Sequence, residues 1–210
     1  MSRTTVMLTG GKGMLGRTLC RELEGFEVIP TDLPETDILQ EDALARQLDR
    51  IAPDVVIHCA AMTAVDRCEA EPDLAYRLNA LGSANVAAAC ARRHIRLVAL
   101  STDYVFSGTG QRPYHEFDVP DGGINVYGQS KWAGEQAVRT HCPDHVIARI
   151  SWLYGPGGPS FVHTMLRLAR RGTRCSGSWM TSAATLPAQV RSLRPCVTSC
   201  FVPAWWARSI

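Results

Sequence analysis

The sequence has no apolar run long enough to span a bilayer, and its N-terminus has no basic stretch that leads into an apolar one. Its formal net charge is only +2, which gives no reason to expect nucleic acid or a membrane surface as a partner. Together these absences favour a soluble globular protein of the cytoplasm.

Paired cysteines and metal-ligand spacing are also missing. The chain has eight cysteines, but it contains no C-x-x-C pair and no cysteine at ligand-like spacing from a histidine. Buried thiols in a reducing compartment are the simpler interpretation, and we expect no metal site. His58 lies inside an apolar run, so we expect a satisfied core histidine there.

A chain of 210 residues that is 46% apolar and 20% charged can bury a proper core. Short apolar runs alternate with helical patterns, and this order predicts a parallel sheet with helices on both faces. The expected fold class is therefore α/β, a Rossmann-type doubly wound parallel sheet. The expected strands are Thr5–Thr9, Glu27–Thr31, Val55–Cys59, Leu97–Leu100 and Val146–Ile150, and the expected helices cover Leu15, Leu19 and Leu23, then Glu41–Arg50, Pro72–Arg93 and the segment that begins at Tyr127.

A glycine-rich loop follows the first strand directly. Gly10, Gly13 and Gly16 form a G-x-x-G-x-x-G pattern before an amphipathic helix, which lets backbone N–H groups approach a pyrophosphate. A plain glycine-rich turn is the alternative. Asp32 follows the second strand, where a carboxylate can accept hydrogen bonds from an adenosine ribose and repel a 2′-phosphate. This favours NADH over NADPH, unless Asp32 only completes a turn with Pro34.

The candidate reactive groups follow the third and fourth strands. Ala60 and Ala61 are small enough for a cofactor to lie against, and Thr102 ends a strand where it could hold a substrate oxygen. Tyr127 and Lys131 stand four residues apart on a helix, so they share one face, and the ammonium is expected to lower the pKa of the phenol. Such a pair more commonly marks a solvated helix face. The cofactor site upstream makes an active site the better interpretation.

Several of these segments together resemble a known family. TGGKGMLG, TDLPETDI, HCAAMTAVDRCEAEP, LSTDYVFSGTG, NVYGQSKWAGE and RISWLYG are similar to the extended short-chain dehydrogenases, and most closely to the dTDP-4-dehydrorhamnose reductases. The resemblance runs from about Thr5 to about Arg171. It implies an enzyme that uses NADPH or NADH to reduce the 4-keto group of dTDP-4-dehydro-6-deoxy-L-mannose. The product would be dTDP-L-rhamnose, a precursor of surface polysaccharides.

The resemblance also implies roles for single residues. Tyr127 would donate the proton, Lys131 would hold the nicotinamide ribose and lower the pKa of Tyr127, and Thr102 would bind the keto oxygen. Substrate contacts are implied for Thr102, Asp103, Tyr104 and Trp152. The positions implied at the cofactor are Gly10, Gly13, Met14, Leu15, Gly16, Asp32, Asp37, Ile38, Ala60, Ala61, Met62, Thr63, Tyr127 and Lys131.

The chain departs from the family at two places. Met62 stands where relatives often have His, a change that a position beside the cofactor should tolerate. The larger departure is C-terminal: acidic residues stop at Asp144, and from Gly172 the sequence has no strand or helix period. We expect residues 1–171 to form the NAD(P)-binding domain and residues 172–210 to be an aberrant, disordered tail that replaces most of the substrate domain. A frameshift near Gly172 would explain this, and the nucleotide sequence would test it.

Two functions of different classes therefore remain open. One is the reductase, which an intact Thr102, Tyr127 and Lys131 favours. The other is a non-catalytic NAD(P)-binding regulatory subunit, similar to the β subunit of methionine adenosyltransferase, or an inactive truncated reductase; the missing substrate domain favours this group. Full-length relatives also pair as homodimers through a metal-assisted interface, whose acidic residues have no counterpart here.

Overall fold

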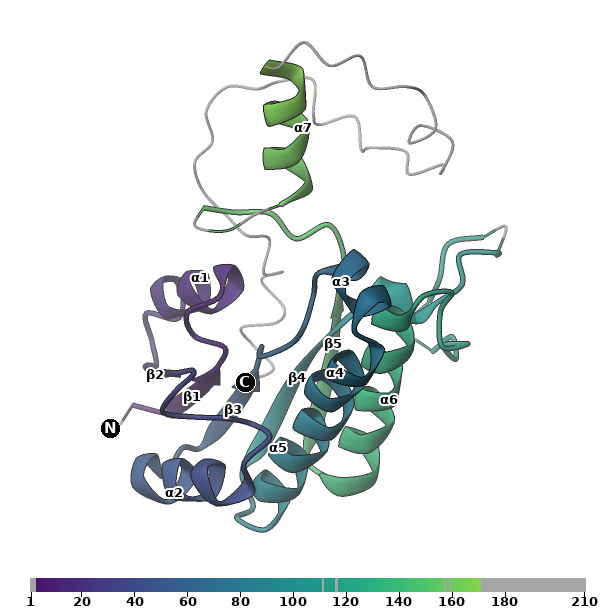
Figure 1. The fold of residues 1–210 in the computed structure, drawn as a ribbon. Helices are drawn as coiled ribbons and strands as arrows, with labels where there is room; N and C mark the ends of the chain where they lie inside the picture. Colours follow the sequence, from purple (N-terminus) through teal and green to yellow (C-terminus); the bar gives the residue numbers. More distant parts are fainter. Residues whose placement is uncertain (1–2, 111, 116, 157, 159, 171–210) are drawn as a thin grey trace. The chain divides into compact units, whose positions relative to one another are not determined.

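The computed structural model describes residues 3–110, 112–115, 117–156, 158 and 160–170 (Figure 1). The chain divides into a unit that ends at Ser151 and a second unit that begins at Trp152. Every strand of the described residues belongs to the first unit.

Five parallel strands form the sheet of the first unit, in the order β2-β1-β3-β4-β5. The expected doubly wound α/β fold is confirmed. The order reverses between β1 and β3, and sheets of this kind bind ligands beyond the C-terminal ends of the strands at such a point. β1 and β2 have the expected bounds, whereas β4 extends to Thr102. The strands are β1 Thr5–Thr9, β2 Glu27–Thr31, β3 Val55–His58, β4 Arg96–Thr102 and β5 His145–Ile150.

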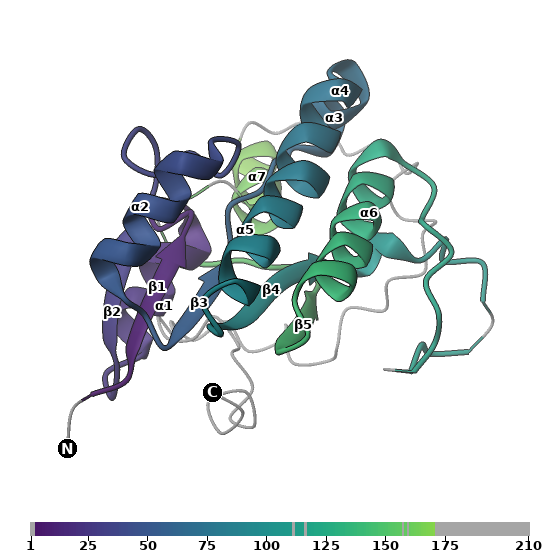
Figure 2. The ribbon, with the colours of Figure 1, turned by 90° about the horizontal axis from the view of Figure 1, so that it is seen from below.

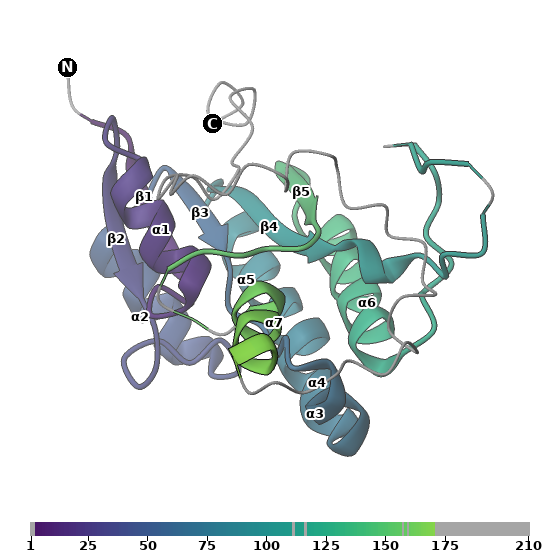
Figure 3. The same cartoon turned by 90° about the horizontal axis from the view of Figure 1, so that it is seen from above.

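Helices cover both faces of this sheet. α1 lies on one face, and α2, α5 and α6 lie on the other (Figure 2, Figure 3). Right-handed crossovers require this arrangement, because the chain steps outward from β1 to β2 through α1 and then runs in the opposite direction to β3, β4 and β5. The helical segments are α1 Met14–Glu22, α2 Glu41–Ile51, α3 Val65–Ala70, α4 Pro72–Tyr76, η1 Arg77–Leu81, α5 Gly82–Ala91, η2 Asp103–Val105 and α6 Val126–His141.

The main core lies between the sheet and the layer of α2 and α5. Met7 of β1 and Val56 of β3 meet Leu44 and Leu48 of α2 and Val86 of α5, all of them buried. The apolar periodicity of α2 and the unbroken apolar run of β3 account for this packing. The core therefore holds β1 and β3 rigidly at the point where the strand order reverses.

One expected helix has a different form. The run from Pro72 to Ala91 is continuous, but η1 inside it is a π-helical turn that carries the fully buried Asn79. Such turns often mark functional sites. The sequence did not predict α3, because this six-residue segment has one buried position, Cys68, and therefore no periodic signal.

The second unit is described as far as residue 170. Its helix α7 spans Phe161–Arg170, and Trp152 at the start of the unit is exposed and has a φ of 52°. The predicted domain boundary at residue 171 and the expected tail of residues 172–210 both lie outside the described residues, so they stay predictions. Within the part that is described, no helix has the length and apolar character to cross a membrane.

Candidate active site

The loop between β1 and α1 packs closely at two of its glycines. Gly10 has a φ of +71°, and a side-chain carbon added there would lie 2.7 Å from the backbone nitrogen of Ala60. One added to Gly16 would lie 2.5 Å from the carbonyl oxygen of Gly10. Only glycine fits at these positions. The loop therefore holds the start of α1 against the ends of β1 and β3.

The N-terminus of α1 is suited to an anion. Its N-cap is Gly13, no side chain caps it, and the first turn contains no acidic residue. Met14 and Leu15 begin the helix, where backbone N–H groups and the helix dipole both favour negative charge. This donor set of uncharged backbone groups fits the pyrophosphate of a dinucleotide.

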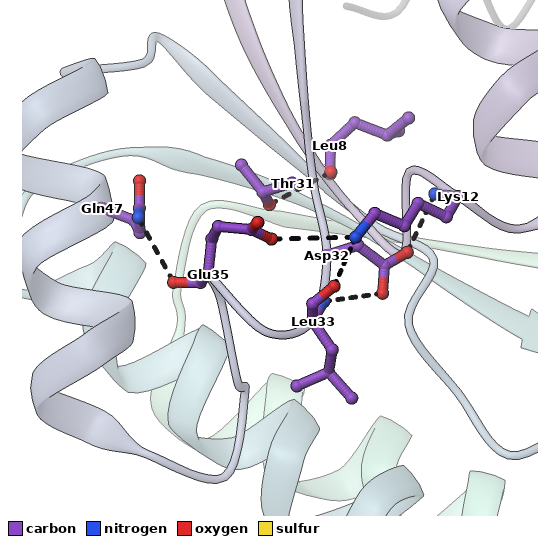
Figure 4. A network of polar contacts seen from close by, with 7 residues as sticks. All are labelled: Leu8, Lys12, Thr31, Asp32, Leu33, Glu35 and Gln47. Carbon is purple, nitrogen blue, oxygen red and sulfur yellow. Dashed lines mark hydrogen bonds and ion pairs between the residues drawn. The ribbon is translucent and has the colours of Figure 1, made fainter.

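Asp32 links the glycine loop to the end of β2 (Figure 4). Its Oδ2 accepts a hydrogen bond from the backbone nitrogen of Lys12, and its Oδ1 accepts one from the backbone nitrogen of Leu33, both at 2.8 Å. Each carboxylate oxygen retains lone-pair capacity for a further donor. Asp32 is therefore both a structural link and a candidate acceptor for a ribose hydroxyl, so the two interpretations from the sequence are compatible.

Lys12 is a charged residue of this loop that the sequence analysis did not single out. Its Nζ donates to the carbonyl oxygen of Leu33 and lies 3.7 Å from Oε2 of Glu35 (Figure 4). The side chains of this ion pair are 66% and 65% exposed, so solvent screens it. One ammonium thus shares the region with the carboxylates of Asp32 and Glu35. The sequence did contain a signal for this residue, because Lys12 is a charged residue inside a glycine-rich loop.

Asn79 of the π-helical turn joins the loop after β3 to α6. Its Oδ1 accepts from the backbone nitrogen of Met62 at 2.8 Å, and its Nδ2 donates to the Met62 carbonyl oxygen and to Ser130 Oγ, both at 3.0 Å. This buried amide fixes residues 60–63, the predicted cofactor loop, relative to the helix that carries Tyr127. Sequence pattern alone gave little signal for Asn79 beyond a polar residue in an apolar helix.

His58 is the satisfied core histidine that the sequence predicted. Its Nδ1 shares a hydrogen bond with Thr9 Oγ1 at 2.8 Å, and its Nε2 shares one with Ser83 Oγ at 3.1 Å. Burial lowers the pKa of His58 to about 3, and the nearby charge of Lys131 acts in the same direction. The ring is therefore neutral at neutral pH and does not serve as a general acid.

Thr102 ends β4 and begins the short turn η2. Its hydroxyl accepts from the backbone nitrogen of Tyr104 at 3.2 Å and donates to Asp103 Oδ1 at 3.1 Å. Tyr104, which donates to Thr102, also packs its ring against that of Tyr127. Two of the three predicted catalytic residues, which come from different elements, therefore share Tyr104 as a neighbour.

Tyr127 lies in the first turn of α6, behind the N-cap Asn125. Its ring meets that of Tyr104 edge to face, with centroids 5.6 Å apart. Burial raises the pKa of Tyr127, and the neighbouring Thr102 only partly offsets this. The expected lowering of this pKa by Lys131 is wrong here, because desolvation of the phenolate dominates.

Lys131 lies one helical turn further along α6 and is only 6% exposed. Its Nζ donates to the carbonyl oxygen of Leu100 at 2.7 Å, so the ammonium is bound to the end of β4. Burial lowers the pKa of Lys131 to about 8, while the charge of Glu135 raises it. Lys131 is thus a buried cation next to the strand that delivers Thr102.

The remaining predicted positions have varied surroundings. Asp37 accepts a hydrogen bond within its own loop at 2.9 Å, and Ile38 is buried in the main core. Met62 lies in a small apolar cluster of α3 and α4, against which Tyr127 also packs. Trp152 belongs to the second unit, so its predicted substrate contact stays a prediction.

A family comparison supports these motifs. The RmlD substrate binding domain family matches residues 4–194. The chain belongs to this family. The resemblance inferred from the sequence motifs is thereby confirmed, and the family match runs past the residue at which that resemblance was expected to end.

Named relatives agree with the family assignment. The dTDP-4-dehydrorhamnose reductase of Mycolicibacterium smegmatis is 42% identical over 167 residues, which are 78% of this chain and 50% of that protein. The enzyme of the same name from Streptomyces griseus is 46% identical over 165 residues, which are 77% of this chain and 54% of that protein. This member of the family therefore spans about half the length of these relatives.

A solved structure in the family has the same fold. The crystal structure of dTDP-4-dehydrorhamnose reductase from Bacillus anthracis in complex with NADP aligns with a TM-score of 0.77 and 43% identity, over 81% of this chain and 61% of that one. The UDP-glucose 4-epimerase of Thermus thermophilus, solved with NAD, is 24% identical with a TM-score of 0.71, which shows a shared fold alone.

Proposed function

We propose that this chain binds NADPH or NADH and belongs to an enzyme that reduces the 4-keto group of dTDP-4-dehydro-6-deoxy-L-mannose to dTDP-L-rhamnose. One observation carries the proposal: Tyr104, whose backbone nitrogen donates to Thr102, packs its ring against Tyr127, while Lys131 is bound to Leu100 on the strand that ends at Thr102. The names of the relatives support the substrate, and the NADP in the Bacillus anthracis structure supports the cofactor.

Separate parts of the first unit would hold the cofactor. The N-terminus of α1 would bind the pyrophosphate, Asp32 would accept the hydroxyls of the adenosine ribose, and Lys131 would bind the nicotinamide ribose. When bound, the reduced nicotinamide supplies a hydride. The close approach of Gly10 to Ala60 leaves the loop after β3 beside the glycine loop, where both can border one extended ligand.

Tyr127 is suited to be the acid of this reaction. Its pKa is raised by burial, so the phenol keeps its proton at neutral pH and can donate it to the keto oxygen. The Thr102 hydroxyl would hold that oxygen. With a hydride added to the carbonyl carbon and a proton added to the oxygen, the product is the alcohol, and Tyr127 recovers a proton from solvent afterwards.

The setting of this activity is part of the proposal. We propose a cytoplasmic location, and from the formal net charge of +2 we infer that nucleic acid is not a partner. NADH is expected to bind at least as well as NADPH because of Asp32, although the nearby ammonium of Lys12 moderates that preference. Pairing as a homodimer is proposed for full-length relatives only, because the acidic residues of their interface have no counterpart in this sequence.

The test has two stages on the 210-residue chain. Binding of NADH and NADPH is measured first by the fluorescence of the reduced nicotinamide, and turnover of the 4-keto sugar nucleotide is then followed by loss of absorbance of the cofactor. Turnover supports the reductase. Tight cofactor binding without turnover would instead support the non-catalytic binding subunit or an inactive reductase, and absence of any binding would refute the proposal.

A further inference from the structure

Glu135 is a buried carboxylate on the helix that carries the candidate catalytic residues. It lies one helical turn after Lys131 and two turns after Tyr127, and its side chain is only 2% exposed. Arg149 Nε donates to its Oε1 at 2.8 Å and Arg149 Nη2 to its Oε2 at 2.6 Å. Ser101 Oγ donates to Oε1 at 2.6 Å. Both carboxylate oxygens are therefore occupied by donors from the sheet.

The two donors come from neighbouring strands at one level. Ser101 of β4 and Arg149 of β5 are partners in the strand register. Ser101 also stands between Leu100, whose carbonyl oxygen accepts from Lys131, and Thr102, whose hydroxyl accepts from Tyr104. Glu135 thus joins α6 to both strands next to the contact that Lys131 makes with β4.

The charges of Lys131 and Glu135 also interact with each other. Both line a cavity of about 10 Å³, which has room for about one water molecule. The charge of Glu135 raises the pKa of Lys131 against the effect of burial. A buried carboxylate therefore supports the charged form of a buried ammonium one turn away.

The network continues beyond the helix. The guanidinium carbon of Arg149 lies 5.2 Å from the centroid of the Phe106 ring, a cation–π distance. Phe106 in turn stacks on Tyr114, with ring centroids 4.2 Å apart. The ion pair thereby also holds the segment that follows Thr102 and η2.

Fold stability alone is a poor reason for such a pair. Desolvation of two buried charges commonly cancels their attraction, and an apolar pair of the same volume is often as stable. The pair lies one helical turn from Lys131 and beside β4, the strand that carries Thr102, and this position indicates another role. We propose that Glu135 is a positioning residue that holds Lys131 against β4 in the geometry needed to bind the nicotinamide ribose.

This inference rests on the proposed function, because it assigns Lys131 to that ribose. The test uses the full 210-residue chain and two probes: NADH, which has the nicotinamide ribose, and ADP, which lacks it. Glu135→Gln keeps the size of the side chain and removes its charge. We expect it to weaken NADH binding about tenfold and to leave ADP binding unchanged within about twofold.

A double-mutant cycle decides whether Glu135 acts through Lys131. In a Lys131→Met background, Glu135→Gln should cause no further loss of NADH affinity, since the group it positions is already gone. A matched control is Glu71→Gln, which breaks the exposed ion pair of Glu71 with Arg67 and should leave both affinities unchanged. An equal loss of NADH binding in both backgrounds, or an equal loss of NADH and ADP, would overturn the inference.

Two further results keep the outcomes separate. Thermal unfolding checks that each variant folds; if Glu135→Gln does not, Ser101→Ala removes a single hydrogen bond and should weaken NADH selectively, by a smaller factor. Unchanged NADH binding in the folded variants overturns the positioning role while the proposed function stands. A wild-type chain that binds neither NADH nor NADPH would instead refute the proposed function, and this inference with it.

Discussion

The carboxylate of Asp32 is expected to set the preference between NADH and NADPH. Both of its oxygens already accept backbone hydrogen bonds, from Lys12 and Leu33. Asp32→Asn removes the charge and keeps one of these two acceptors in a side chain of nearly the same shape, because an amide has a single acceptor oxygen. Asp32→Ala removes the charge and both loop contacts together, so a comparison of the two variants separates electrostatics from loop geometry.

The magnitude follows from the charge removed. A carboxylate that bonds a ribose hydroxyl lies about 5 Å from a phosphate on the same ribose, and at an effective dielectric constant of about 40–80 the repulsion is about 1–2 kcal/mol per phosphate charge. Asp32→Asn should thus improve NADPH affinity relative to NADH about tenfold. Any loss from a weaker loop contact affects both nucleotides and cancels in the ratio.

The assay is a fluorescence titration of both reduced nucleotides with wild type, Asp32→Asn and Asp32→Ala, at low and at high salt. The gain for NADPH should shrink at high salt, because ions screen exposed charges. An affinity ratio that stays unchanged in both variants would refute the reasoning. Asp32 would then be only the link between the glycine loop and β2.

Four other outcomes are expected. Lys12→Gln should lower NADPH affinity more than NADH affinity, since it removes the ammonium that the glycine loop places beside Leu33 and Glu35; equal effects would place Lys12 away from the 2′-position. In a family member with a complete substrate domain, replacing the equivalent of Tyr127 by Phe should reduce kcat about 100-fold or more with nearly unchanged nucleotide affinity, and near-normal turnover would contradict the acid role. Burial lowers the pKa of His58 from 6.5 to about 3. Between these two pH values the histidine is protonated in the unfolded chain but not in the folded chain. The free energy of unfolding should therefore decrease by up to about 1.4 kcal/mol per pH unit there, and His58→Gln should flatten the slope measured by urea unfolding; an unaltered slope would show that other groups cause it. Gly134→Ala should destabilise the fold by about 1–3 kcal/mol, because the added carbon would lie 2.3 Å from the carbonyl oxygen of Asn79, and an unchanged urea midpoint would show that α6 can shift away.

Local patterns in the sequence predicted much of the fold. The first two strands have the bounds that their apolar runs indicated, and the helix over Glu41–Ile51 follows its spacing of leucines. The sequence also predicted that His58 lies in the core with its hydrogen bonds satisfied. These features depend on side-chain period and on neighbours in the chain, which a sequence displays directly.

The pKa shifts of the site residues were harder to predict from the sequence. The sequence indicated that Tyr127 and Lys131 share a helix face, yet the direction of the phenol pKa came out opposite, because burial of the phenol is the largest influence on it. The extent of burial depends on Tyr104, Met62 and the helices α3 and α4, which pack around the ring from distant parts of the chain. The spacing of residues along the sequence does not show how strongly such contacts desolvate the phenol.

By itself, the sequence determined the strand and helix order, the glycine loop, the position of Asp32 after β2, and the pairing of Tyr127 with Lys131 on one helix. Only the tertiary structure decided which polar groups meet across the chain: Lys12 with Glu35, Asn79 with Met62, and Glu135 with Arg149 and Ser101. The physical reason is that periodicity records which face of an element is buried, whereas the partner of a buried polar group depends on how separate elements pack.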